Sequence, residues 1–131
     1  MQYSVAVNNA RLDAVETAIG ASPKLRFYTG AMPANCAAAR TGTLLVEMAL
    51  PADWMSAASA ASKAKLGTWS GVAVAGAAAT PGYACIMDTA GTTCHQQGTS
   101  GIASGEIPVD GTITAGQTVT VNSYTLNSAN T

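Results

Sequence analysis

The sequence predicts a mainly β protein, an antiparallel sandwich or barrel with one α-helix at its N-terminus. Two observations carry this prediction. Apolar residues recur at helical spacing only near the start of the chain, whereas the rest consists of short apolar runs separated by Gly, Pro, Asp and Asn. The 131 residues have the length of one ordinary domain, so we expect a single domain over residues 1–131.

The helix is expected over about residues 4–19. Ser4 can cap its first turn by accepting a backbone N–H, with Asn8 as the alternative cap, and Gly20 can end it. The apolar stripe is narrow, which suits a helix that lies across the end or face of a sheet. Its members recur at near-helical spacing: Val5, Leu12, Val15 and Ile19.

After Gly20 the apolar period changes to two. Residues 88–91 place Asp first and Gly fourth, which favours a type I turn in a hairpin. Residues 98–105 are rich in Gly and Ser and are expected to form a flexible loop. Residues 53–65 form an irregular segment whose composition permits a short helix, a long loop or an arm. Strands are expected over residues 25–28, 44–50, 72–77, 83–88, 92–97, 107–109, 112–114 and 118–126.

Small side chains dominate the composition. Ala, Gly, Ser and Thr account for 66 of the 131 residues, and only seven residues are aromatic. Such side chains fill little volume, so the core must be built from close backbone approach and a few large residues. We therefore expect a thin core and a chain that gains stability by binding to something larger.

Charge is sparse, with six basic and seven acidic residues and a net charge of −1. The basic residues are too scattered to form the stripe that neutralises nucleic-acid phosphates. The first residues lack the pattern of a signal peptide. The uncharged segment 66–87 is dominated by Gly and Ala and broken by residues 80–82, which predicts two strands and a turn. We therefore expect neither a nucleic-acid nor a membrane partner.

Each constellation that could carry chemistry lacks a partner. His95 is the only histidine, and its neighbour Cys94 would point to the opposite face of a strand. A zinc site would need Cys36, Cys85, Cys94 and His95, but no two of them have the C-x-x-C type of spacing that is typical of structural zinc sites. The sequence predicts a protein that is not an enzyme and has no metal or cofactor.

Two further motifs do not indicate a catalytic or phosphate-binding site. The carboxylates of Asp13 and Glu16, three residues apart, suit the solvated face of the helix. Residues 71–76 have the glycine spacing of a phosphate loop, but Ala77 stands where lysine is required.

Two pairs of residues are the candidate sites. Cys85 and Cys94 would stand opposite each other if the hairpin loop has two residues, which would permit a disulfide, whereas a longer, bulged turn would separate them. A reducing cytoplasm argues against the bond, and buried free thiols are the alternative. Trp54 and Trp69 are either core anchors or anchors of a protein interface, where Trp is enriched.

Three stretches resemble a family of small proteins encoded in structural-gene regions of tailed phages and prophages. They are residues 4–14 (SVAVNNARLDA) continuing through 19–21 to 24–30 (KLRFYTG) and 33–34, residues 113–121 (ITAGQTVTV), and the hairpin over residues 83–93. The similarity covers about two-thirds of the chain and is weakest over residues 53–82. Members are generally of unassigned role, and no catalytic residues are known for them.

The resemblance implies a virion component assembled in the host cytoplasm. The first possible role is a capsid decoration, or cement, protein that stabilises the lattice of the major capsid protein. Its partners would be the major capsid protein or copies of itself, and it would form a homo-oligomer on the particle. A terminal arm that adds a strand to a neighbour would supply affinity through main-chain hydrogen bonds. A tail or neck component (tube, terminator or adaptor) is the second role, and a receptor- or glycan-binding module is the third.

Overall fold

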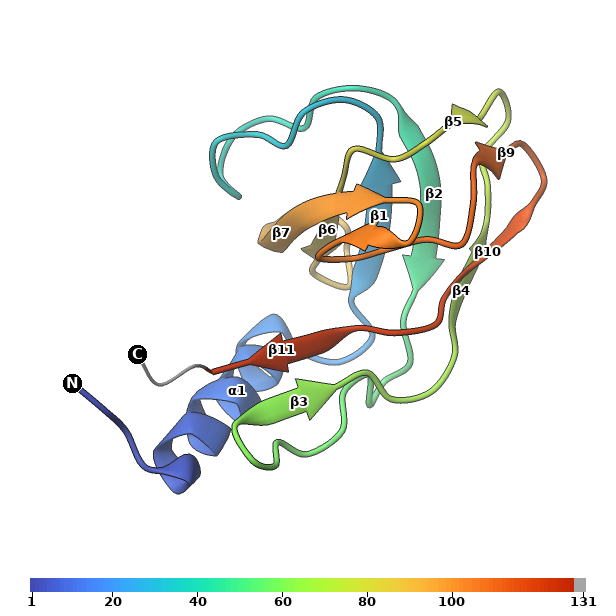
Figure 1. Cartoon of the computed structure of the whole chain (residues 1–131). Helices are drawn as coiled ribbons and strands as arrows, with labels where there is room; N and C mark the ends of the chain where they lie inside the picture. The colour runs from blue at the N-terminus through green and yellow to red at the C-terminus, as the bar shows by residue number, and fades with distance from the viewer. Residues whose placement is uncertain (129–131) are drawn as a thin grey trace.

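The computed structural model describes residues 1–128, which are mainly β with one N-terminal helix and antiparallel sheets in a sandwich-like arrangement (Figure 1). The helix α1 spans Val5–Ile19. The strands are β1 (Lys24–Tyr28), β2 (Leu44–Ala49), β3 (Ser62–Ala64), β4 (Trp69–Val72), β5 (Ala78–Ala79), β6 (Tyr83–Met87), β7 (Cys94–Gly101), β8 (Ser104–Gly105), β9 (Ile113–Thr114), β10 (Thr118–Val121) and β11 (Thr125–Asn127).

Five strands form the main sheet, in the order β2-β1-β6-β7-β8. The other strands form two-stranded ladders, β4 with β10, β3 with β11 and β5 with β9, all antiparallel. The ladders β4–β10 and β3–β11 lie end to end, because β3 and β4 are consecutive in the chain and so are β10 and β11. We call these two ladders together the ribbon. In Figure 1 the ribbon descends from beside β2 to α1. It touches β2 through the bridge between Val46 and Ala73, and Gly71 is required there because a Cβ would lie 2.5 Å from the Glu47 carbonyl oxygen.

The predicted helix is confirmed, including both caps. Ser4 Oγ accepts a hydrogen bond from Val7 N–H (3.3 Å), and the Gly20 N–H donates to the Glu16 carbonyl at a φ of 91°. The predicted apolar stripe is only partly correct. Leu12 and Ile19 are buried, but Val5 is 54% exposed, because the first turn of the helix extends beyond the sheets.

An ion-pair cluster fixes α1 to the ribbon. Lys63 on β3 has a side chain only 2% exposed, and its Nζ donates to Asp13 Oδ1 (2.7 Å), Glu16 Oε2 (2.8 Å) and the Ser56 carbonyl (2.8 Å). Burial lowers the pKa of Lys63, but the two carboxylates outweigh burial and the net shift is upward. The hydrogen bond from Lys63 lowers the pKa of Asp13. The two carboxylates therefore form a docking site, which corrects their interpretation as a solvated face.

The segment over residues 53–65 contains no helix. Met55 pairs with Lys65 through an isolated bridge, and the chain then turns between Ser59 and Ser62 into β3. The two central residues of that turn are alanines with φ of 51° and 60°, the signs that a two-residue type I′ hairpin requires. Alanine gives no sequence signal for such a turn, which explains the ambiguity of this stretch.

The predicted hairpin after β6 is confirmed in its turn. The Gly91 N–H donates to the Asp88 carbonyl (2.9 Å), and Asp88 Oδ1 accepts from the Thr92 N–H (2.8 Å). The Thr92 N–H and the Thr93 N–H (3.2 Å) both donate to this carboxylate, and their hydrogen bonds lower the pKa of Asp88 to about 2 from 3.8. Their contribution to stability is therefore present above about pH 3.8 and is lost as pH falls toward 2.

Three predicted segments are wrong. Residues 107–109, expected to form a strand, contribute only an isolated bridge between Val109 and Ile102. The strand expected over residues 72–77 begins earlier, as β4, and gives way to a turn closed by the Ala77 N–H and the Val74 carbonyl (3.1 Å). The loop expected over residues 98–105 is the end of β7 and a tight return into β8. Its Gly and Ser content reflects close approach and not flexibility, because a Cβ on Gly101 would meet Ser104 Oγ.

The main core lies between the sheet, the ladders and α1. Its largest fully buried members are Trp54, Trp69, Phe27, Leu25, Leu45, Met48, Met55, Ile86, Ile107 and Ile113. A smaller cluster covers the other face of the sheet, where Tyr28 and Tyr83 stack with centroids 5.2 Å apart. The loop after β1 lies over this cluster, because the Tyr83 hydroxyl donates to the Thr41 carbonyl (2.7 Å) and accepts from the Thr41 N–H (3.0 Å).

Replacing Lys63 by Met is expected to lower the free energy of unfolding by about 1.5–3 kcal/mol, because α1 loses the charged hydrogen bonds that fix it to β3. Urea denaturation measures the difference. Lys24→Met is the matched control, since Lys24 forms only a partly exposed pair with Glu47 at 3.6 Å and should cost less than about 1 kcal/mol. Equal losses in the two variants would contradict the docking role of Lys63.

Candidate protein-binding groove

Trp54 and Trp69 lie in the core, with no exposed side-chain area. Their ring centroids are 5.9 Å apart, and each indole N–H has a main-chain acceptor: Trp54 donates to the Gly20 carbonyl (3.0 Å) and Trp69 to the Leu66 carbonyl (3.1 Å). Of the two interpretations of this pair, the structure supports core anchors. Because both side chains are completely buried, they cannot contact a partner directly. The interpretation of the pair as interface anchors is therefore corrected.

The aromatic cluster continues to Tyr124, which reaches from the ribbon to the main sheet. Its ring lies 5.1 Å from that of Trp69, and its hydroxyl donates to Gln96 Oε1 on β7 (2.6 Å). Tyr124 is only 5% exposed, and burial raises the pKa of its hydroxyl above the usual range. The length of a tyrosine side chain therefore separates β11 from β7.

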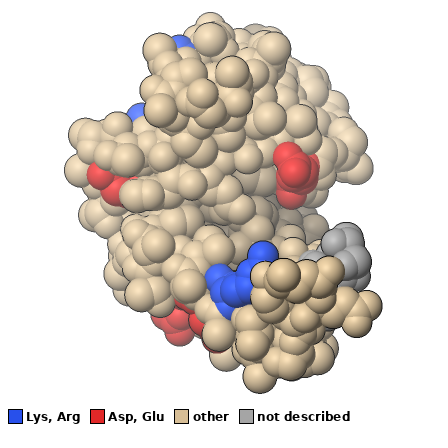
Figure 2. Space-filling view, turned by 90° about the vertical axis from the view of Figure 1, so that its left-hand side faces the viewer, with Lys and Arg blue, Asp and Glu red and all other residues tan. Residues whose placement is uncertain are grey.

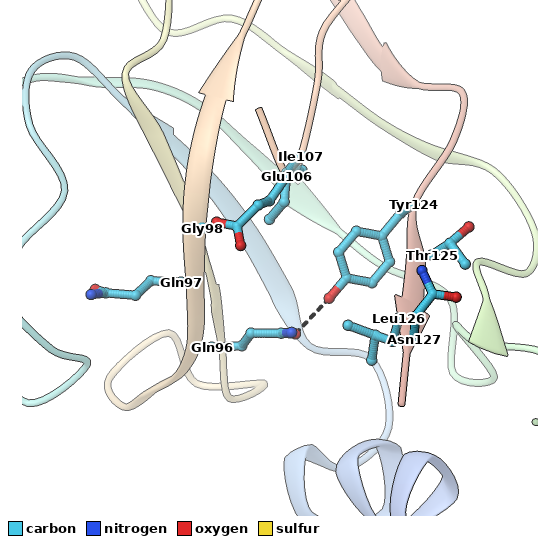
Figure 3. A pocket seen from close by; sticks show the side chains of 9 residues that line it. All are labelled: Gln96, Gln97, Gly98, Glu106, Ile107, Tyr124, Thr125, Leu126 and Asn127. Atoms are coloured by element: carbon cyan, nitrogen blue, oxygen red, sulfur yellow. Dashed lines mark hydrogen bonds between the residues drawn. The ribbon is translucent and has the colours of Figure 1, made fainter. Parts of the chain in front are cut away.

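A groove of about 360 Å³ lies where β7 and β11 are held apart. In Figure 3, β7 forms one side, β11 forms the other, and the bond between Tyr124 and Gln96 crosses between them. A hollow crosses the face shown in Figure 2, between the upper and lower parts of the molecule. The lining residues are Gln96, Gln97, Gly98, Glu106, Ile107, Tyr124, Thr125, Leu126 and Asn127.

The side of the groove formed by β7 presents the main chain of Gln97. In this strand the Ser100 N–H donates toward β6, to the Gly82 carbonyl (3.1 Å), whereas the Thr99 carbonyl faces the opposite edge and accepts from the Glu106 N–H (2.9 Å). Main-chain groups alternate between the two edges of an antiparallel strand. Gln97, two residues before Thr99, therefore directs its N–H and C=O to the outer edge. β8 pairs only with the last two residues of β7 and leaves this position uncovered.

The side formed by β11 presents two more such residues. The Lys65 N–H donates to the Tyr124 carbonyl (2.9 Å), and the Ser128 N–H donates to a carbonyl of the β3 hairpin (2.9 Å). The same alternation turns the main-chain groups of Thr125 and Asn127 away from β3 and toward the groove. The groove is therefore bordered by two strand edges whose main-chain N–H and C=O groups point away from the strands they pair with.

Of the described residues that line the groove, Glu106 alone is charged. Its Oε2 accepts from the Thr99 N–H (2.9 Å), which holds the carboxylate over Gly98, where a Cβ would lie 2.9 Å from the same oxygen. Gln97 points to the opposite face of the sheet, where its side chain accepts from Arg40 (2.8 Å) and donates to the Pro33 carbonyl (2.8 Å). The groove therefore combines open main-chain edges, a polar floor and one anion.

The disulfide between Cys85 and Cys94 is not formed, and all three cysteines are free thiols. A bulge in β7 places Cys85 opposite Gln97 and Cys94 opposite Met87, which is the register shift that a longer turn produces. Burial raises the pKa of Cys85, and burial together with the neighbouring thiol of Cys36 raises the pKa of Cys94 to about 12. Both thiols are therefore protonated near neutral pH and unsuited to nucleophilic chemistry.

Within residues 1–128, no group of three or more His, Cys, Asp or Glu side chains is placed to hold a metal ion. His95 is exposed on β7, beside the half-buried Cys94. Among the helices of residues 1–128, none is long and apolar enough to cross a membrane.

Comparison with known proteins gives no assignment: no family model matches the chain, and no curated protein or solved structure matches it either.

The groove was not predicted from the sequence. Its two sides come from residues about thirty positions apart in the sequence. Which main-chain groups point into the groove depends on the register of β7 with β6 and of β11 with β3. A local signal exists only in Tyr124, a large residue between small polar ones at the expected end of the last strand.

Tyr124→Phe should lower the free energy of unfolding by about 0.5–1.5 kcal/mol, because it removes only the hydroxyl bond to Gln96. Tyr124→Ala should cost about 3–5 kcal/mol, because the ring between Trp69 and β7 is lost as well. Urea denaturation of the two variants separates the contributions. Near-equal effects of the two substitutions would show that ring packing does not hold the ribbon and the sheet in place.

Proposed function

We propose that this protein is a non-enzymatic structural component of a tailed-phage virion, a capsid decoration protein that stabilises the lattice of the major capsid protein. The observation that carries the proposal is the groove between the open edges of β7 and β11. Such edges bind another polypeptide through main-chain hydrogen bonds, which give affinity without any catalytic chemistry.

The resemblance to small phage structural proteins supports the virion context. It rests on residues 4–14, 19–21, 24–30, 33–34, 83–93 and 113–121. The distribution of charge agrees with a protein partner. Lys and Arg side chains are few and separated on the face shown in Figure 2, so that face has no basic stripe for nucleic acid. Both the major capsid protein and further copies of this chain are candidate partners, with a homo-oligomer on the particle.

A tail or neck role would use the same kind of strand addition but in a ring of few copies. Copy number separates the two roles. Quantitative mass spectrometry of purified particles from the phage or prophage that encodes the chain should find hundreds of copies per particle, because decoration follows the capsid lattice. A count of six or twelve would contradict decoration and assign the protein to the tail or neck.

A glycan-binding module is the second candidate function, because the groove is lined by amide, hydroxyl and carboxylate groups. Tyr124 is the one aromatic residue of the lining, and its ring is buried beneath the groove and not exposed as a stacking platform. Micromolar binding of the purified protein to a glycan array would favour this function over decoration.

A further inference from the structure

We propose that the groove between β7 and β11 receives a short extended segment of another polypeptide, which pairs with both strands at once and places a Lys or Arg side chain against Glu106. The inference rests on the proposed role as an assembly protein and specifies the chemistry of its partner. It is based on the directions of the two strands, their open main-chain edges and the carboxylate of Glu106.

The directions of the two strands determine how a segment in the groove would pair. β7 runs from Gln96 toward Gly98 in the direction opposite to that of β11 from Tyr124 toward Asn127 (Figure 3). An inserted strand would therefore be antiparallel to one neighbour and parallel to the other. Three residues line the groove on each side. At a rise of about 3.3 Å per residue, the space fits a segment of three or four residues.

Main-chain pairing determines how the segment is held. Successive residues of a strand direct their N–H and C=O groups to alternate sides. Alternate residues of the inserted segment can thus bond to Gln97 on β7 and to Thr125 and Asn127 on β11. The segment would therefore be held by main-chain hydrogen bonds at both edges together.

The charge of the groove determines one side chain of the partner. Glu106 Oε2 already accepts from the Thr99 N–H, but a carboxylate has capacity for further donors. No Lys, Arg or His is found among the described residues that line the groove. A segment lying over Glu106 would remove water from the carboxylate, which is unfavourable unless a cation replaces that water. A basic side chain supplies the cation, and an acidic one in the same place would be rejected.

The test titrates the whole protein with short capped peptides at millimolar concentration and follows backbone amides by NMR. The first probe is acetyl-Thr-Val-Lys-Val-Thr-amide, and its twins carry Gln or Glu in place of Lys. The Lys peptide should shift the amides of Gln97, Thr125 and Asn127 and bind about fivefold more tightly than the Gln peptide, with the Glu peptide weaker still. A peptide N-methylated at its central residues should lose most of the binding, because it cannot donate to either edge.

The charge assignment is tested in the protein as well. Glu106→Gln keeps an acceptor for the Thr99 N–H and should abolish the preference for Lys over Gln. Asp110→Asn removes the same charge from an exposed residue outside the groove lining and should leave the preference unchanged. A preference that survives Glu106→Gln would overturn the assigned contact.

Other outcomes overturn the strand addition itself. Equal binding of the N-methylated peptide would show that the main chain does not pair, and absence of any amide shift would show that the groove takes no peptide. If a glycan shifts the same amides and the peptides do not, the groove is a carbohydrate-binding site and not a peptide-binding site. None of these results changes the number of copies per particle, so failure of this inference is distinguishable from failure of the proposed virion role.

Discussion

The contact of Tyr124 with Trp69 on one side and Gln96 on the other is the interaction on which the arrangement of the ribbon and the sheet depends. Half of the chain consists of small residues, so few side chains can define a distance between layers. The aromatic cluster supplies that distance, because its rings are rigid and large and have polar groups bonded at their ends. Trp54 extends the cluster to the end of α1 through the Gly20 carbonyl.

The groove follows from this separation. One edge of β11 pairs with β3, and Lys63 fixes β3 to α1. The other edge of β11 therefore remains open and borders the groove on the side of β7. Open strand edges are a hazard, because they pair with other chains and lead to aggregation. Here the two edges border one groove of about 360 Å³, which is the space proposed to receive a single extended segment. The same geometry suits a protein that attaches to a partner through a terminal arm or loop.

The parts of the fold that depend on local chemistry were predicted from the sequence. The caps of α1 at Ser4 and Gly20, the turn from Asp88 to Gly91 and the strands before and after it follow from residue type and period. The errors have long-range causes. The burial of a cation near Asp13 and Glu16 requires Lys63, fifty residues later in the case of Asp13. The register that separates Cys85 from Cys94 depends on a bulge that no residue type announces.

Residue-resolved amide hydrogen exchange of the free protein tests the open edges most directly. Gln97, Thr125 and Asn127 should exchange rapidly, while their neighbours Gly98 and Leu126 should be protected, because alternate amides face β6 and β3. The proposed strand addition predicts that the same three amides become protected when a peptide segment is bound in the groove. Uniform protection along both strands of the free protein would mean that the edges are already paired, and it would contradict the account.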